Sequence, residues 1–600
     1  MDRQQAKHII KETFENPFHK GRFVRFVKNL LNSFDETKAF HARGYVKEEF
    51  KKTESIVKTY ERIGTFTDFE GNKIDLLIVY LEKNNSIEIA RTTLRNFVAS
   101  YLKKRGEKDA ALVAFVSPDK EDWRFSLVKM DYKFEQTKTG RIKVKEEFTP
   151  ARRWSFLVGK NENSHTAQSR LVNILANDEH SPTIAELEQA FDIETVTKEF
   201  FIKYRELFIR TKEELDMVVK TNSKIRADFE AKDVNTVDFA KKLLGQIVFL
   251  YFLQKKGWFG VGRDAEWGTG SKHFLRELFK KKHSDYKNFF NDILEPLFYE
   301  ALRIDRSHDD DYYSRFNCKI PFLNGGLFDP IGSYDWVHTD ILLPDELFSN
   351  NIKTKEDIGT GILDVFDRYN FTVKEDEPLE KEVAIDPELL GKAYEKFNAI
   401  RPDNFEEYKK ALKSGNKGEE SKFNKQYGVY YTPREIVHYM CQQSLINYLF
   451  TECNTPYPLM GEGKGEGVIL NDVKNLIISK EDIEALIHTG EQVSENEEIA
   501  LIKEQKILEG KQKSSDYKLM LPESIRKNAI LIDQKLADIT VCDPAVGSGA
   551  FPVGMMSEIV KARNVLTTFL SPSPNPSHQG RGNYNESPLP LRESNCVVKG

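Results

Sequence analysis

A glycine-rich turn in the last part of the sequence restricts the fold more than any other feature of the chain. Residues 539–563 read ITVCDPAVGSGAFPVGMMSEIVKAR. The apolar run before Asp543 predicts the end of a buried strand, and the apolar positions after Gly549 follow the spacing of a helix. Gly547 and Gly549 make a tight turn between the two. The segment therefore predicts a strand–turn–helix unit of an α/β domain.

A unit of this kind is suited to binding a ligand at its turn. Ligands of open α/β sheets bind beyond the carboxyl ends of the strands, and glycine lets the backbone approach a ligand closely because it lacks Cβ. The amides at a helix N-terminus bind anionic groups. A dinucleotide fingerprint requires G-x-G-x-x-G, but Pro552 stands at the third glycine position. The pattern therefore argues against a nicotinamide cofactor.

A second turn comes earlier in the chain, where residues 427–435 read YGVYYTPRE. Thr432 and Glu435 have the spacing of a capping box, and Pro433 stands at the first helical position. The run IVHYMCQQSLINYLF follows directly. The segment predicts a helix with a well-defined start.

These two segments resemble two motifs of the N6-adenine DNA methyltransferases. DPAVGSGAF resembles motif I, whose loop surrounds S-adenosyl-L-methionine, and GVYYTP resembles motif X, which holds the methionine end of that cofactor. The order, with motif X before motif I, is similar to the γ arrangement. The resemblance implies cofactor contacts from Tyr431, Thr432, Pro433, Asp543, Pro544, Ala545, Gly547, Ser548 and Gly549.

The catalytic motif of that family has no counterpart at the expected place. The family uses an [Asn/Asp]-Pro-Pro-[Tyr/Phe] loop that holds the flipped adenine. After motif I the chain offers only Asn575-Pro576-Ser577, and Asn454-Thr455-Pro456-Tyr457 precedes motif I and has Thr in place of the first Pro. A single βα unit also cannot bury its apolar faces alone. We therefore expect a chain truncated after motif I, or half of a split enzyme that needs a second chain.

The N-terminal region predicts a small α/β domain. The strand-like runs ERIGTFTDF and IDLLIVYL are joined by the turn-prone residues 70–72, and a helix over 87–104 and the strands ALVAFV and WRFSLVKM follow. This layout resembles a restriction-endonuclease-like fold. Such a nuclease binds Mg²⁺ through an Asp and an E-x-K triplet on neighbouring strands, for which Asp75 and Glu82 are weak candidates. Lys83 directly follows Glu82, so a degenerate, DNA-binding version is favoured, and Mg²⁺ is expected only if the domain is an active nuclease.

Basic residues in this region are candidates for contacts with DNA phosphates, although a solvated helix face explains them equally well. They are Lys20, Arg22, Arg25, Arg91 and Arg95.

The whole chain predicts a multidomain fold that combines α/β and α-helical parts. The expected parts are a nuclease-like α/β domain at 1–160, a mainly helical connector at 165–425, an incomplete Rossmann-like methyltransferase domain at 426–570 with a polar insertion at 456–530, and a disordered tail at 571–600.

Charge, cysteine spacing and apolar runs limit the kinds of surface and the cellular environment that we expect for this chain. The net charge is −5, so a surface for nucleic acid must be a local patch. The five cysteines form no C-x-x-C pair, which fits a reducing cytoplasm. The longest apolar run, Leu243–Leu253, is too short to span a membrane.

The order of the parts resembles single-chain restriction–modification enzymes of the type IIG kind. Further similar stretches are DAALVAFVS, ARRWSFLVG, PFLNGGLFD and PELLGKAYEKF. The resemblance implies a site-specific DNA adenine-N6 methyltransferase that acts on double-stranded DNA, of which the isolated chain is an inactive fragment. The alternatives are a non-catalytic DNA-binding or defence-complex subunit and a metal-dependent endonuclease.

Overall fold

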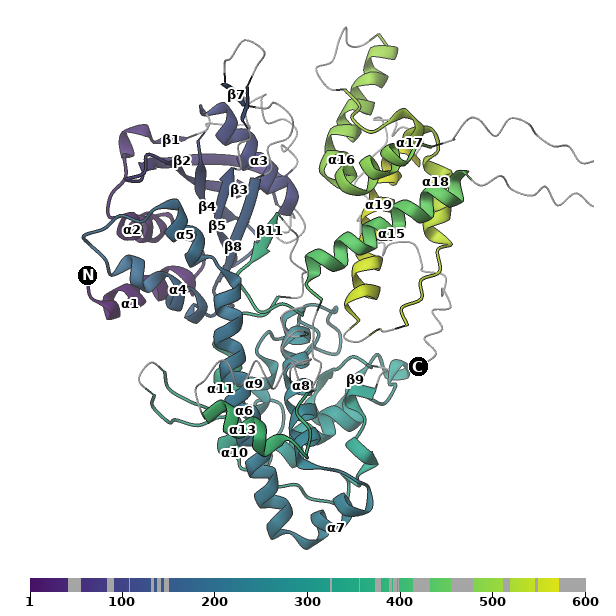
Figure 1. Cartoon of the computed structure of the whole chain (residues 1–600). Coiled ribbons are helices and arrows are strands. Elements are labelled where there is room, and N and C mark those ends of the chain that lie inside the picture. The colour runs from purple at the N-terminus through teal and green to yellow at the C-terminus, as the bar shows by residue number, and fades with distance from the viewer. Residues whose placement is uncertain are drawn as a thin grey trace, which may run out of the picture. The chain divides into compact units, whose positions relative to one another are not determined.

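The computed structural model shows a mixed α/β protein with two compact units, Met1–Val429 and Tyr430–Gly600 (Figure 1). The structure describes residues 1–41, 56–83, 91–106, 108–130, 134–136, 142–144, 151–323, 326–354, 357–372, 379–387, 391, 397, 399–413, 432–454, 478–510, 518–544, 546 and 549–570. The tail expected at 571–600 lies outside these residues.

A seven-stranded mixed sheet organises the first unit. Its spatial order is β1-β2-β3-β4-β5-β8-β11. The β3–β4 and β8–β11 pairs are parallel and the other pairs are antiparallel. The strands are β1 (Phe40–His41), β2 (Val57–Thr67), β3 (Lys73–Leu81), β4 (Ala110–Val116), β5 (Asp122–Met130), β8 (Ala151–Gly159) and β11 (Glu380–Glu382).

The predicted hairpin is confirmed as β2 and β3. At the turn, Gly71 has φ +88°, a value that glycine adopts without strain. The Asp68 Oδ1 accepts hydrogen bonds from the backbone N–H groups of Glu70 (3.0 Å) and Asn72 (2.9 Å). The sequence could predict this turn, because Asp, Asn and Gly favour turns through local hydrogen bonds and a positive φ.

Both faces of the sheet are buried, so its strands are nearly continuous apolar runs. Along β3, alternate side chains enter two different cores, Ile74 and Ile78 on one face and Leu77 and Val79 on the other. The first face is covered by α1 (Arg3–Phe14), α2 (Lys20–Leu31), α4 (His165–Leu175) and α5 (Ile184–Ala190), and the second by α3 (Arg91–Lys104) (Figure 1).

A helical region continues the first unit without a break in its core. The buried cluster on the first face of the sheet runs from Ala6 to Tyr408, and β11 adds a strand to the sheet from this region. Residues on both sides of position 160 therefore share one core. The helices here are α6 (Ile193–Thr221), α7 (Ser223–Ala231), α8 (Thr236–Lys255), α9 (Phe274–Phe279), α10 (Asp345–Phe348), α11 (Ile362–Phe366) and α13 (Phe405–Lys413).

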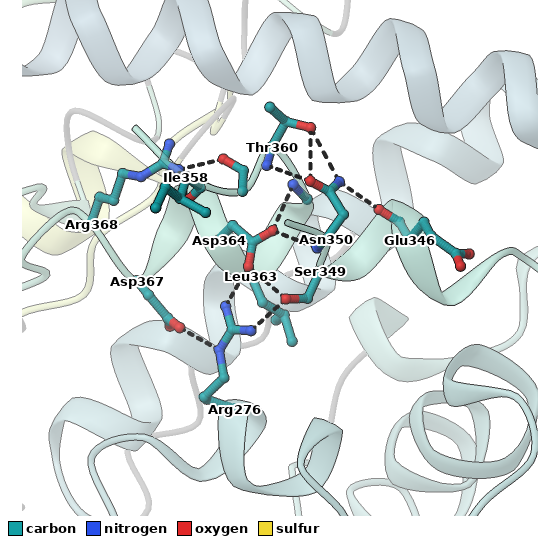
Figure 2. A network of polar contacts seen from close by, with 12 residues as sticks. Arg276, Glu346, Ser349, Asn350, Ile358, Thr360, Leu363, Asp364, Asp367 and Arg368 are labelled. Atoms are coloured by element: carbon teal, nitrogen blue, oxygen red, sulfur yellow. Dashed lines mark hydrogen bonds and ion pairs between the residues drawn. The ribbon is translucent and has the colours of Figure 1, made fainter. Parts of the chain in front are cut away.

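A polar network holds the short helices α9, α10 and α11 together (Figure 2). The Asp364 carboxylate accepts hydrogen bonds from Arg276 Nη2 (3.0 Å), Ser349 Oγ (2.6 Å) and the Asn350 N–H (2.9 Å). Arg276 Nε also donates to Asp367 Oδ2 at 2.6 Å. Burial raises the pKa of Asp364, but these hydrogen bonds outweigh it and the pKa is lowered. The network satisfies buried polar groups and has a structural role.

The second unit is helical in the part that the structure describes. Its core gathers apolar side chains such as Leu449, Ile483, Ile532 and Leu566. The helix bearing Ile483 lies in the stretch expected to be a polar insertion, yet it contributes to this core. The helices are α15 (Arg434–Asn454), α16 (Lys480–Leu508), α17 (Glu523–Lys527), α18 (Ala529–Ala537) and α19 (Ala550–Leu570). Throughout the described ranges of the chain, no helix is both long enough and apolar enough to cross a membrane.

Candidate cofactor site

The glycine turn before α19 has the backbone geometry that its sequence predicts. Gly549 has φ +80°, and a Cβ added there would meet no atom of the described residues within 4 Å. Its N–H donates to the Val546 carbonyl at 2.7 Å, and its carbonyl accepts from the Val553 N–H at 3.1 Å. The turn therefore leads directly into a long helix and leaves open space beside Gly549. Asp543 and Pro544 precede the turn, whereas Ala545, Gly547 and Ser548 lie outside the described residues.

The strand expected before this turn is not formed, which corrects the prediction for residues 539–542. The segment is irregular, Val541 is 38% exposed and Cys542 is exposed. A strand needs a neighbour to accept its hydrogen bonds, and the described residues of this unit include no other strand. The Rossmann-like part of the fold prediction is therefore not seen in these residues.

The earlier turn also leads into a helix at the expected place. The Pro433 carbonyl accepts hydrogen bonds from the N–H groups of Ile436 (3.0 Å) and Val437 (3.1 Å). Thr432 and Pro433 thus stand immediately before the first residue of α15, one position from the predicted start. Tyr431 lies outside the described residues.

The two helices that follow these turns are in direct contact near their N-terminal ends. A Cβ on Gly554 of α19 would come within 2.8 Å of Val437 Cγ1 on α15, so a larger residue at 554 would require the Val437 side chain or one helix to shift. The Cys441 thiol lies 3.8 Å from the Phe551 carbonyl oxygen. Burial and the nearby Glu558 charge raise the pKa of Cys441 to about 11. Cys441 is therefore a protonated packing residue that joins the two helices.

A buried carboxylate, Glu558, lies in this helix contact and was not singled out from the sequence. Its Oε1 is 2.8 Å from His438 Nδ1, and its Oε2 accepts from Gln442 Nε2 at 2.8 Å. Glu558 is 4% exposed. Burial raises its pKa, but the bonds from His438 and Gln442 and the charge of Lys561 outweigh burial and lower it. The sequence signal is a single acid within the apolar pattern GMMSEIV.

The proposed metal residues of the first unit do not come together, which corrects the weak pairing of Asp75 with Glu82. Asp75 is fully buried, and its carboxylate accepts from Thr65 Oγ1 (2.9 Å) and Tyr101 Oη (3.0 Å). Arg105 Nε lies 3.4 Å from it. Glu82 stands beyond the other end of β3, about 23 Å away at the rise of a strand. No metal-binding cluster is found among the described residues.

The basic residues considered for DNA phosphates have partners within the protein. Lys20 Nζ is 2.5 Å from Glu61, Arg25 is 3.6 Å from Glu12, and Arg22 donates to the Pro17 carbonyl at 2.9 Å. Arg91 pairs with Glu382 and Arg95 with Glu380. Contact between these side chains and DNA phosphates stays a prediction. To bind a phosphate, each side chain would have to give up the contact that it makes within the protein.

A buried arginine and glutamate cluster fixes β11 to the sheet. Arg124 on β5 donates to Ser155 Oγ (3.3 Å) and to Glu382 on β11. Arg153 on β8 stacks over the Phe115 ring at 5.2 Å, and burial lowers the pKa of its guanidinium to about 10. Sequence patterns do not predict such a cluster. A charged residue in a strand is normally expected to be exposed, because it is buried only beside a partner, and the partner is not visible in the local sequence.

One curated relative supports a restriction–modification relationship. The chain is 26% identical over 392 residues to a Methanocaldococcus jannaschii protein named "Putative type II restriction enzyme and methyltransferase", and the match covers 62% of this chain and 26% of the relative. The chain thus spans about a quarter of the length of that relative. No protein-family model and no solved structure matches the chain.

Proposed function

We propose that this chain is part of a site-specific DNA methyltransferase of a restriction–modification system, which transfers a methyl group from S-adenosyl-L-methionine to adenine N6 in double-stranded DNA. The observation that carries the proposal is the direct packing of α15 on α19, the helices that start at the motif X-like and motif I-like turns. The helices that follow these two segments, which are far apart in the sequence, are thereby in contact. The restriction–modification relative supports the same class.

The residues at these turns fit the cofactor. The open space at Gly549 admits a ligand close to the backbone, and the first amides of α19 are suited to its carboxylate. In the proposal, Asp543, Pro544, Ala545, Gly547, Ser548 and Gly549 hold the cofactor from one side and Tyr431, Thr432 and Pro433 hold its methionine end. When bound, the cofactor supplies the methyl group.

Exposed apolar residues on both helices support the proposal that a methyltransferase sheet packs beside this site. On α15 the side chains of Ile436, Tyr439 and Met440 are exposed, and on α19 those of Val553, Met556 and Val560. Each set follows helical spacing and forms an apolar face with no cover in the described residues. In the proposal, these faces bind the remaining strands of the methyltransferase sheet, which bring the catalytic [Asn/Asp]-Pro-Pro-[Tyr/Phe] loop.

Isothermal titration of the full chain with S-adenosylmethionine and S-adenosylhomocysteine tests the proposal. The matched pair of variants is Gly549→Val and Gly510→Val, because both glycines have positive φ and open space around them, but only Gly549 belongs to the turn. We expect the wild type and Gly510→Val to bind and Gly549→Val to lose binding. A wild-type chain that binds neither compound at millimolar concentration contradicts the proposal.

Methyl transfer is tested separately with a radiolabelled cofactor and plasmid DNA. Residues 1–600 contain no [Asn/Asp]-Pro-Pro-[Tyr/Phe] sequence, so we expect label on adenine when a polypeptide that carries this loop is present and none when it is absent. Label on cytosine instead of adenine would refute the proposed N6 specificity.

A further inference from the structure

Glu558 is a buried charged residue in the contact between α15 and α19. We propose that Glu558 is a positioning residue that sets the spacing between the two cofactor turns by holding α15 against α19. This inference rests on the proposed function, since it concerns the same cofactor site. Glu558 lies within α19 and is not part of the glycine turn that precedes this helix.

The contact between His438 and Glu558 lies near both turns. His438 lies five residues after Pro433, or about 7.5 Å along an α-helix. Glu558 lies nine residues after Gly549, or about 13.5 Å. A shift of one helix along the other at the His438–Glu558 contact therefore moves one turn relative to the other by a similar amount.

The chemistry of the contact explains why a carboxylate serves this purpose. Both carboxylate oxygens are used, one toward His438 and the other toward Gln442, at 2.8 Å each. Because His438 and Gln442 are four residues apart on one face of α15, the two bonds together restrain rotation and sliding of that helix. Apolar packing is not directional, so by itself it restrains sliding less.

A third helix supports the same contact. His488 Nδ1 on α16 lies 3.1 Å from Gln442 Oε1, which orients the Gln442 amide toward Glu558. Lys561 on α19 lies 3.6 Å from Glu558 and 3.8 Å from Glu491 on α16. Glu558 is thus the centre of a network that includes α15, α16 and α19.

The test measures cofactor affinity and thermal stability of the full chain in parallel. Glu558→Leu keeps the size of the side chain and removes the hydrogen bonds, and His438→Leu does the same from the other side. His438→Gln keeps a donor. Asp533→Asn is the control, because it weakens another ion pair of α19, in which Arg563 Nε lies 2.8 Å from Asp533.

We expect Glu558→Leu and His438→Leu to weaken S-adenosylmethionine binding by about tenfold or more, whereas His438→Gln and Asp533→Asn stay near the wild type. The melting temperature of Glu558→Leu is expected to fall, because His438 and Gln442 lose a buried partner, so the affinities are compared at a temperature where every variant is folded. Positioning is distinguished from a general structural role because His438→Gln keeps the affinity that His438→Leu loses, and because Asp533→Asn, which also weakens a contact of α19, leaves the affinity unchanged.

Three results would overturn the inference. Wild-type affinity in Glu558→Leu means that the carboxylate does not position the turns. Equal weakening in Asp533→Asn means that any damage to α19 has the same effect. A wild-type chain that fails to bind removes the proposed function and this inference with it, whereas the first two results leave the proposed function intact.

Discussion

Arg124 on β5 donates a hydrogen bond from Nη1 to Glu382 Oε2 on β11 at 3.0 Å, although the two residues are 258 positions apart in the sequence. Both are buried, at 1% and 3% exposed. This ion pair therefore joins the helical region to the sheet that precedes it.

Glu382→Ala is expected to destabilise the first unit by about 3–5 kcal/mol, because Arg124 is left as a buried charge without its partner. Urea denaturation followed by circular dichroism measures the change. Glu206→Ala, which removes an exposed pair with Lys203, is the control and is expected to cost under about 1 kcal/mol. Equal effects of the two changes would contradict a structural role for the buried pair.

The same pair predicts a loss of stability in acid. Burial raises the pKa of Glu382, but the charges of Arg124 and Arg91 outweigh it and lower the pKa to about 2 from an ordinary 4.5. Since the folded-state pKa is the lower one, the stabilisation is present above about pH 4.5 and is lost as the pH falls toward 2. Urea midpoints between pH 6 and pH 3 should therefore fall less steeply in Glu382→Gln than in the wild type, and identical slopes would disprove this assignment.

Asp75→Ala is expected to destabilise the first unit by about 3 kcal/mol, because Thr65, Tyr101 and Arg105 lose a buried acceptor. Added Mg²⁺ is expected to leave the melting temperature of the wild type unchanged, since the carboxylate already has these partners. A Mg²⁺-dependent rise that disappears in Asp75→Ala, together with Mg²⁺-dependent nicking of plasmid DNA, would instead support the endonuclease alternative.

Cofactor binding is expected to protect Cys542 from thiol reagents. Cys542 is exposed beside Asp543, whereas Cys318, Cys441 and Cys453 are buried, and burial raises the pKa of Cys318 to about 12. In a Cys596→Ser background, Ellman's reagent should modify one cysteine rapidly, and S-adenosylhomocysteine should slow that reaction. An unchanged rate at saturating ligand would place the ligand away from this turn.

Local chemistry made several features predictable from the sequence. The β2–β3 hairpin follows from Asp68 and Gly71, and the starts of α15 and α19 follow from Pro433 and Gly549, because turn and capping preferences depend on a few neighbouring residues. The expected strand before Asp543 failed for the opposite reason. Its hydrogen bonds require a partner strand, which a run of apolar residues does not reveal.

The turns, the helix starts and the apolar patterns can be read from the sequence, since each depends on residues only a few positions apart. The pairing of Glu382 with Arg124, the enclosure of Asp75 by Thr65 and Tyr101, and the contact of Glu558 with α15 depend on how distant segments pack. The physical reason is that a buried charge is stable only beside its partner, and which residue becomes that partner depends on how segments distant in the chain pack together.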